Sequence, residues 1–291
     1  MVRDHARPLV RVQHHYAHVL SCMAENQLGP PLLGVAWDGT GYGLDGTIWG
    51  GEWLRVNDTS FERIAHLRTF RLPGGEQAVR EPRRAALGLL YEIYGDALFA
   101  MEDLAPLRAF SAQERAVMQT MLRRGINAPV TSSAGRLFDA VAAIAGLRQI
   151  SRYEGQAALE LECRLAEIET DDAYPVRVYA HPRVQIVDWE PMISSIVDDV
   201  RRGLPAGLIA AKYHNALAEM IVAVAVRVDE ERVVLSGGCF QNRYLLERAV
   251  ARLCARPASV PPGTSASRPT MAASRSARCS RRRATSKRIE A

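Results

Sequence analysis

Two glycine-rich turns, each directly after a short apolar run, constrain most strongly what this chain can fold into. The first, Asp38-Gly39-Thr40-Gly41-Tyr42-Gly43, follows the apolar run 32–37. The second, at 236–242, follows the run 233–235 and leads into a helix expected from Arg243. Short apolar runs bounded by turn residues are typical of buried strands, and backbone amides at such strand ends can cradle phosphate. The pattern predicts an α/β protein with two candidate phosphate-binding turns, although an ordinary hairpin also uses such glycines.

Three of the seven histidines fall within five residues, at His14, His15 and His18. If residues 14–26 form one helix, the i, i+4 spacing places His14 and His18 on one face, about 6 Å apart at Cβ. Such a pair suits one divalent ion, because imidazole binds iron, zinc or nickel. His15 faces elsewhere and is a candidate acid/base or a group that supports the ligands. The alternative is a surface cluster at a helix start; the density of histidines just ahead of the first turn favours a metal site.

The rest of the chain reads as helices with a few strands. A returning strand is expected at 47–56 and an apolar helix at 140–147. Asp139 precedes that helix within an otherwise apolar face, which is unusual unless its carboxylate meets a partner or ligand. A strand pair is expected at 176–180 and 184–187, and a helix is expected to start at the capping box Ser111-Ala112-Gln113-Glu114. Further helices are expected at 82–94, 156–165, 191–201 and 206–226. In the last of these, His214 is interpreted as a packed or capping residue.

Composition limits the class of protein and its partners. Of 291 residues, 48% are hydrophobic and 24% charged, as in a soluble globular protein. No apolar run approaches the roughly 18 residues of a membrane helix, so no membrane segment is expected. The five cysteines show no metal-binding or disulfide spacing and are interpreted as reduced thiols of a cytoplasmic protein.

The positive net charge is confined to the end of the chain. Nine basic residues and one acidic residue lie from Cys254 onward, so of the net charge of +5 the segment 254–291 carries +8 and residues 1–253 carry −3. No nucleic-acid partner is therefore expected. Residues 254–291 are also rich in Pro, Ser, Ala, Thr and Arg without apolar periodicity, which predicts a disordered basic tail after one domain at 1–253.

Seven short motifs occur along the chain in one order. They are Gln13-His14-His15-x-Ala17-His18, Asp38-Gly39-Thr40-Gly41-Tyr42-Gly43, Leu72-Pro73-Gly74-Gly75, Arg80-Glu81-Pro82, Gly135-Arg136-Leu137-Phe138-Asp139-Ala140-Val141, Tyr153-Glu154-Gly155-Gln156-Ala157-Ala158 and Ser236-Gly237-Gly238-x-Phe240-Gln241-Asn242. Each is weak alone. As a set they resemble the carboxyl-terminal catalytic region of the HypF carbamoyltransferases, which act in [NiFe]-hydrogenase maturation, over about residues 8–253.

The resemblance implies an actin/sugar-kinase-like fold with two ribonuclease-H-like lobes and a nucleotide cleft between them. It implies transfer of a carbamoyl group from carbamoyl-adenylate to the carboxyl-terminal cysteine of HypE, for cyanide ligand synthesis. In this reading His14 and His18 hold a divalent metal, iron or zinc, and His15 and Asp38 are the catalytic candidates. The residues expected to bind ATP or carbamoyl-adenylate are Gly39, Gly41, Asp139, Gly155, Gly237, Gly238 and Asn242.

The chain departs from the family pattern at both ends, so other functions stay open. The domain that forms carbamoyl-adenylate is expected ahead of the region matched, and no such segment precedes the histidine helix. An inactive nucleotide-binding fragment is one alternative, because a metal ligand and one wall of the cleft are missing from the family pattern. A small-molecule O-carbamoyltransferase is another. The family's Asp-Gly-Gly-x-x-Leu-Gly-Gln segment is absent as well, which predicts an incomplete carboxyl-terminal part.

The codons of the tail can encode that segment in another reading frame. Read from the third base of the Pro269 codon, the codons through Arg278 permit Asp-Asp-Gly-Gly-Ile-Ala-Leu-Gly-Gln, and the Met271 codon forces one of the glycines. We therefore predict that the tail is a frameshifted reading of the family segment, whose Asp is a metal ligand in the family. A genuine basic tail is the alternative.

Overall fold

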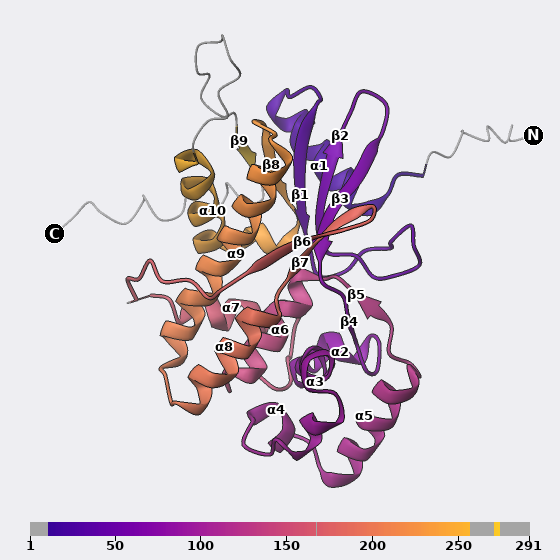
Figure 1. Ribbon diagram of the computed structural model, residues 1–291, viewed down its shortest axis with the longest axis vertical. Coiled ribbons are helices and arrows are strands. Elements are labelled where there is room, and N and C mark those ends of the chain that lie inside the picture. Colours follow the sequence, from indigo (N-terminus) through magenta and orange to yellow (C-terminus); the bar gives the residue numbers. More distant parts are fainter. Residues whose placement is uncertain (1–10, 167, 257–270, 274–291) are drawn as a thin grey trace, which may run out of the picture.

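The computed structural model describes residues 11–166, 168–256 and 271–273, and its main element is a seven-stranded sheet (Figure 1). The strand order is β6-β7-β3-β2-β1-β8-β9. The strands are β1 (Leu32–Trp37), β2 (Gly51–Val56), β3 (Phe61–Leu67), β6 (Arg177–His181), β7 (Val184–Asp188), β8 (Val233–Ser236) and β9 (Met271–Ala273). A second, two-stranded sheet pairs β4 (Phe70–Arg71) with β5 (Val130–Thr131).

The strand directions identify the fold class. β1, β2 and β3 are antiparallel neighbours, and β8 and β9 continue from β1 in parallel. β7 runs parallel to β3, and β6 is antiparallel to β7 at the far edge. Three antiparallel strands followed by two parallel ones form a ribonuclease-H-like lobe, so the expected α/β class is confirmed. Of the two lobes that the resemblance implies, the described residues contain this one.

The expected strands are found, with one shifted start. β1 has the predicted bounds, and the predicted pair is β6 and β7. The returning strand begins at Gly51 and not at Thr47, because a local hydrogen-bond network holds the preceding residues in a loop. Asp45 Oδ1 accepts hydrogen bonds from Thr47 N at 3.1 Å and from Trp49 Nε1 at 2.9 Å.

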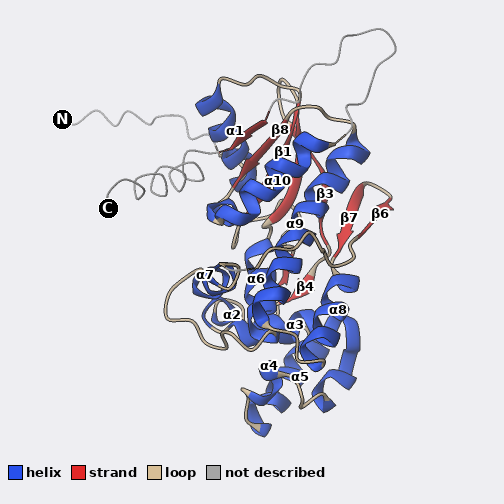
Figure 2. Cartoon of the chain, turned by 90° about the vertical axis from the view of Figure 1, so that its left-hand side faces the viewer, coloured by secondary structure: helices blue, strands red, loops and turns tan. Residues whose placement is uncertain are grey.

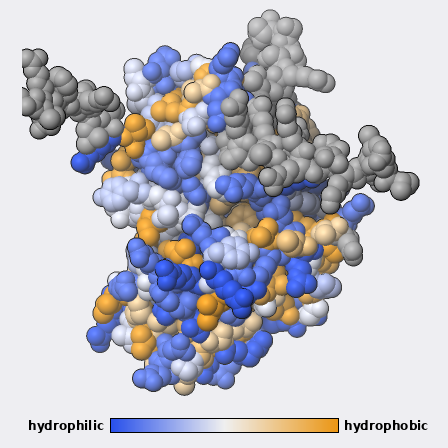
Figure 3. Space-filling view, turned by 180° about the vertical axis from the view of Figure 1, so that it is seen from behind, coloured by the Kyte–Doolittle hydropathy of each residue, from blue (hydrophilic) through white to orange (hydrophobic). Residues whose placement is uncertain are grey.

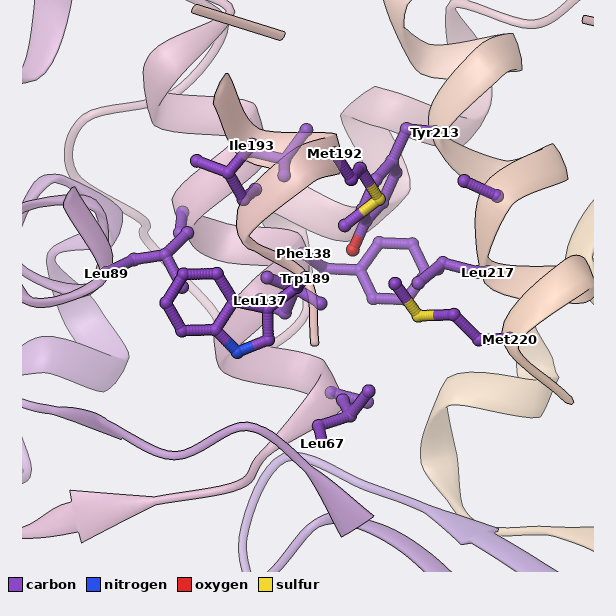
Figure 4. Packing of buried hydrophobic residues seen from close by; sticks show 14 of the residues in the cluster. Leu67, Leu89, Leu137, Phe138, Trp189, Met192, Ile193, Tyr213, Leu217 and Met220 are labelled. Atoms are coloured by element: carbon purple, nitrogen blue, oxygen red, sulfur yellow. The ribbon is translucent and has the colours of Figure 1, made fainter. Parts of the chain in front are cut away.

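Helices cover the sheet and build the lower half of the molecule in Figure 1. They are α1 (His14–Asn26), α2 (Gln77–Arg80), α3 (Pro82–Tyr94), α4 (Ala105–Arg108), α5 (Ala112–Arg124), α6 (Ala134–Ile144), α7 (Gln156–Cys163), α8 (Glu190–Arg201), α9 (Ala206–Val228) and α10 (Arg243–Ala255). The capping box expected at Ser111 and Glu114 is confirmed at the start of α5. Figure 4 shows how α6, α8 and α9 turn Phe138, Met192 and Leu217 toward one another in the main core.

The two faces of the sheet pack against different helices (Figure 2). Successive side chains of a strand point to opposite faces, and in β1 both sets are apolar. Val35 and Trp37 belong to the large core shared with α6, α9 and α10, whereas Leu32 and Ala36 pack beneath α1 with Val19. A strand buried on both faces fits the continuous apolar run seen in the sequence.

α6 starts earlier than the sequence suggested. The helix was expected from Ala140 but begins at Ala134, because Ser133 Oγ accepts a hydrogen bond from Arg136 N at 3.1 Å and caps its first turn. Asp139 therefore lies in the middle of a buried helix and not ahead of one. Its carboxylate consequently needs a partner inside the protein.

α9 is the one described helix that is long and apolar enough to cross a membrane by length and composition. In this structure 72% of its most apolar window is buried inside the protein, as in the core helix of a soluble domain. On the face shown in Figure 3, hydrophobic residues are scattered among hydrophilic ones and form no continuous apolar area.

Two described elements include residues that follow residue 253. α10 continues to Ala255, and Met271–Ala273 pair in parallel with β8 as β9. The disorder expected of the remaining tail, and most of the segment in which the frameshift is predicted, lie outside the described residues. The division at residue 253 stays a prediction.

Candidate functional site: a histidine cluster beside a cavity

A close helix–strand approach brings the start of α1 to the end of β1. A Cβ atom at Gly34 would lie 2.4 Å from Val19 Cγ2, so only glycine lets α1 lie this close to the strand. The helix expected over residues 14–26 is confirmed. Its first turn, with His14, consequently lies beside Asp38, the residue that directly follows β1.

His14, His18 and Asp38 form a compact cluster of possible metal ligands. His18 Nε2 lies 2.9 Å from Asp38 Oδ2, His14 Nε2 lies 3.4 Å from the same oxygen, and the two Nε2 atoms are 3.2 Å apart. All three ligand atoms lie within 4.8 Å of one another. Two imidazoles and a carboxylate are the donor set of many zinc and non-haem iron sites. The three residues therefore fit a divalent metal, and Asp38, a catalytic candidate from the sequence, lies beside the expected histidine pair.

Asp38 also joins the two glycine-rich turns. Its Oδ1 accepts a hydrogen bond from Gly39 N at 2.7 Å, and a Cβ atom at Gly238 would lie 2.9 Å from the same oxygen. Burial opposes ionisation, but hydrogen bonds from His18 and Gly39 outweigh it and lower the pKa of Asp38 to about 2. Asp38 is thus a carboxylate at neutral pH, held where both turns meet the histidines.

His15 is enclosed and is not one of the three clustered ligand groups. Gln13 Oε1 accepts from Tyr16 N at 2.9 Å, so its Nε2 is the donor to Tyr42 O at 3.1 Å and lies 3.2 Å from His15 Nδ1. His15 Nδ1 is then the acceptor, and among the described residues its buried Nε2 has no hydrogen-bond partner. Burial lowers the pKa of His15 to about 4, so the ring is neutral at pH 7.

A cavity of about 580 Å³ opens beside the cluster. It brings together six of the predicted residues, which come from four distant segments of the chain: Asp38, Gly39, Asp139, Gly155, Gly238 and Asn242. It is also lined by residues that were not predicted as site residues, among them Arg136, Tyr153, Glu154, Glu162 and Cys239. The volume is typical of a site for a small organic ligand.

Two of the predicted glycines serve the backbone instead of the cavity wall. A Cβ atom at Gly41 would lie 2.4 Å from His15 Cε1, so this glycine makes room for the histidines. Gly237 has φ +101° and approaches Trp37, with 2.2 Å between its ideal Cβ position and Trp37 O. Both residues shape the turns, and neither is among the residues that line the cavity.

Asn242 has structural contacts that occupy much of its amide. Its Oδ1 accepts from Leu245 N at 2.9 Å and caps α10, while its Nδ2 lies 2.9 Å from His214 Nε2. His214 Nδ1 lies 2.7 Å from Ala210 O, and burial lowers the pKa of His214 to about 4. The expectation of a packed histidine is confirmed, and the pair couples α9 to the cavity-lining turn.

The start of α10 is already occupied by a carboxylate. Glu162 Oε1 accepts hydrogen bonds from Arg243 N at 2.7 Å and Tyr244 N at 3.5 Å. The glycine-rich turn that leads into this helix was a candidate phosphate-binding turn. The backbone donors are instead used within the protein, because α7 brings Glu162 across from a distant segment.

Asp139 and Arg136 form a buried pair on one turn of α6. Arg136 Nη1 lies 3.0 Å from Asp139 Oδ2, and both side chains are about 5% exposed or less. Burial raises the pKa of Asp139 to about 6, although Arg136 opposes the shift. The sequence contained a signal for this pair in the i, i+3 spacing within the quoted motif.

The fold and site define one lobe of an actin/sugar-kinase-like protein with a candidate metal cluster, and comparison with known proteins identifies its family. The chain matches the family described as "Carbamoyltransferase, Kae1-like Domain, second subdomain" over residues 34–263 and "HypF Kae1-like domain" over residues 1–25. The first match covers most of the chain, so the chain belongs to the HypF carbamoyltransferase family. The histidine pair lies within the second match and Asp38 within the first.

Individual relatives agree with this assignment. The chain is 41% identical over 263 residues to carbamoyltransferase HypF of Synechocystis sp., covering 86% of this chain and 34% of that protein. It is 36% identical over 258 residues to a carbamoyltransferase HypF homolog of Cupriavidus necator, covering 86% of this chain and 64% of that protein. A crystal structure of full-length HypF in the phosphate- and nucleotide-bound form superposes with a TM-score of 0.81 at 36% identity, covering 94% of this chain and 41% of that chain. The chain thus spans about a third of the length of the Synechocystis relative.

Proposed function

We propose that this chain is a carbamoyltransferase module that binds carbamoyl-adenylate in the cavity and passes the carbamoyl group to the carboxyl-terminal cysteine of a HypE-like protein. The observation that carries the proposal is the position of Asp38, which belongs to the histidine cluster through Oδ2 and also lines the cavity. Membership in the HypF family supports the transfer reaction. The phosphate- and nucleotide-bound form of a HypF relative supports a nucleotide in the cavity.

In this proposal His14, His18 and Asp38 hold the divalent metal. Their side chains are between about a fifth and a half exposed, which leaves the ligand atoms accessible to an ion. Asp38 is ionised at neutral pH, as a carboxylate ligand must be. A bound iron or zinc ion supplies positive charge that stabilises negative charge developing on the reacting group.

The other cavity residues hold the nucleotide. Asp139 offers a carboxylate to ribose hydroxyls, and the Asp38 and Gly238 side of the cavity lies nearest to the histidine cluster. The acceptor sulfur attacks the carbamoyl carbon, so a C–S bond forms while the C–O bond to the phosphate breaks. AMP leaves with the electrons of that bond, and the thiol proton passes to water.

His15 has a supporting role in this proposal. Its ring is enclosed, neutral and held through Nδ1 by Gln13, which also holds Tyr42 O in the first glycine-rich turn. This arrangement favours orientation of the turn over proton transfer, and it retains one of the two roles expected from the sequence.

Calorimetry and a transfer assay test the proposal. The chain should bind AMP, and binding should strengthen when Zn²⁺ or Fe²⁺ is added. Supplied with carbamoyl-adenylate and a peptide ending in the acceptor cysteine, it should form a thiocarbamate that mass spectrometry detects. Binding of AMP without any transfer would favour the inactive nucleotide-binding fragment, and failure to bind AMP would contradict both readings.

A further inference from the structure

We propose that Arg136 binds the phosphate group of the nucleotide in the cavity and thereby positions the nucleotide. The proposed function gives Arg136 no role of its own. The inference rests on the proposed nucleotide function. It follows from the unused hydrogen-bond capacity of Arg136, from the internal hydrogen bonds that occupy two nearby helix starts, and from the charges that line the cavity.

Arg136 is a buried cation with unused donors. Its side chain is 4% exposed, and within the described part of the chain its Nε and Nη1 atoms have no hydrogen-bond partner. Asp139 Oδ2 lies 3.0 Å away, yet the geometry forms no hydrogen bond and that oxygen also has no donor. Burying a guanidinium without hydrogen bonds is costly. Its planar fork of N–H groups matches the oxygens of a phosphate.

Arg136 is placed beside the first glycine-rich turn. Gly135 N donates to Asp38 O at 3.1 Å, and Ser133 Oγ lies 2.8 Å from Gly39 O, so the start of α6 is tied to this turn. An ideal Cβ atom at Gly39 would lie 3.5 Å from Arg136 Nη2. A phosphate held by Arg136 would therefore lie between the nucleoside part of the cavity and Asp38 of the histidine cluster.

Two helix starts at the cavity have no backbone donors to spare for an anion. At α10, the first N–H groups donate to Glu162 and to Asn242. At α6, they donate to Gly50 O, Asp38 O and Ser133 Oγ. Helix starts commonly bind phosphate through such groups. Because these groups are used internally, neither helix start has such donors to spare, and the donor that lies beside them is the side chain of Arg136.

Arg136 also differs in charge from the other ionisable residues of the cavity wall. Among the described residues that line the cavity, Arg136 is the only basic one, beside the acidic residues Asp38, Asp139, Glu154 and Glu162. So acidic a wall repels a free phosphate unless a cation faces it. Arg136 supplies that compensation on one side of the cavity, and a metal held by the histidine cluster would supply it on the other.

Comparing AMP with adenosine tests the role of Arg136, because adenosine has the same base and ribose but no phosphate. We expect wild-type protein with Zn²⁺ to bind AMP more tightly than adenosine in calorimetry. In Arg136→Gln the preference for AMP should fall about tenfold to a hundredfold, the range for a charge-assisted hydrogen bond. Adenosine affinity should change by less than about threefold, which also reports that the cavity is intact. Arg136→Lys should lie between, since it keeps the charge without the fork.

Arg83→Gln is the matched control, because Arg83 is also buried on a helix but pairs with Glu81 and Glu114 away from the cavity. It should leave the AMP preference unchanged, whatever it does to stability. An AMP preference that survives in Arg136→Gln would overturn the inference and move the phosphate elsewhere, for example to the start of α7. Equal affinity of wild-type protein for AMP and adenosine would overturn it too, with the nucleoside site retained. Failure of wild-type protein to bind either compound would contradict the proposed function itself.

Discussion

At the scale of single residues, the fold keeps one titratable group of the site ionised and keeps two histidines neutral. Asp38 is held ionised by donors from His18 and Gly39, whereas His15 and His214 are kept neutral by burial. Neutral imidazole is the form that hydrogen-bonds through one nitrogen as donor and the other as acceptor. His214 uses both nitrogens in this way between Ala210 and Asn242.

The first residue-scale prediction concerns the metal. His14→Ala or His18→Ala should lower the bound Zn²⁺ or Fe²⁺ per chain, because each removes one of three clustered ligand atoms. His15→Ala is the internal control and should retain most of the metal, since His15 is not one of the three clustered ligand groups. Metal content is measured by inductively coupled plasma mass spectrometry after dialysis. Equal content in wild-type protein and the His14/His18 double variant would refute the assignment.

The second concerns pH and His214. Its pKa is about 4 in the folded protein and near 6.5 when unfolded, so the unfolded chain binds more protons between these values. Stability should therefore fall as pH falls from 6.5 to 4, by roughly 3 kcal/mol from this residue. His214→Asn removes the titrating group, and its urea unfolding free energy should depend less steeply on pH by about that amount. Parallel pH curves for the two proteins would contradict the burial argument.

At the scale of elements, the metal cluster depends on how closely α1 lies against β1. The histidines belong to the helix and Asp38 to the turn after the strand, so their spacing is set by packing between the two. Gly34 permits that packing, because Val19 occupies the space that any side chain there would need.

Gly34→Ala should therefore affect both stability and metal binding. The new methyl group meets Val19 Cγ2 at 2.4 Å and must push α1 outward, which should cost about 1–3 kcal/mol of unfolding free energy. Metal affinity should weaken as the histidines move away from Asp38. Gly29→Ala is the control, since a Cβ atom there meets nothing within 4 Å. Val19→Ala added to Gly34→Ala should recover part of both losses, and no recovery would argue against this steric cause.

At the scale of the whole molecule, the site is assembled from segments that are far apart in the sequence. The turn after β1, the starts of α6 and α7, and the turn after β8 meet around one cavity. The chain after α10 also contributes to the whole fold, because β9 pairs with β8 and extends the sheet.

Sequencing the DNA tests the frameshift prediction for this tail. The codons from Pro269 to Arg278, read from the third base of the Pro269 codon, should spell an Asp-Gly-Gly-x-x-Leu-Gly-Gln segment, and a single-base insertion or deletion should lie near the codons for 250–260. Restoring the frame should raise metal affinity and thermal stability, because it would return the carboxylate ligand of the family segment and bind the metal to the folded chain more tightly. A confirmed reading frame whose shifted translation lacks Asp-Gly-Gly would end the idea.

The sequence by itself determined the elements and the family. These predictions rest on local patterns: the apolar run of β1, the i, i+4 histidines and the order of seven motifs. Local patterns can be recognised in a sequence without knowing how its segments pack. They predicted the α/β class and the helix at 14–26, both confirmed, and six of the residues that line the cavity. They misplaced the start of α6 and of β2, because the Ser133 cap and the Asp45 loop depend on side-chain hydrogen bonds that periodicity does not report.

Only the tertiary structure decided which groups act together. It placed Asp38 within ligand distance of both histidines, enclosed His15, and used the start of α10 for Glu162. It also left Arg136 buried with donors to spare. Distances and burial at such positions arise from packing between segments that are separated in sequence, by 24 residues for His14 and Asp38 and by 81 for Glu162 and Arg243. A linear pattern of residue types does not contain that information.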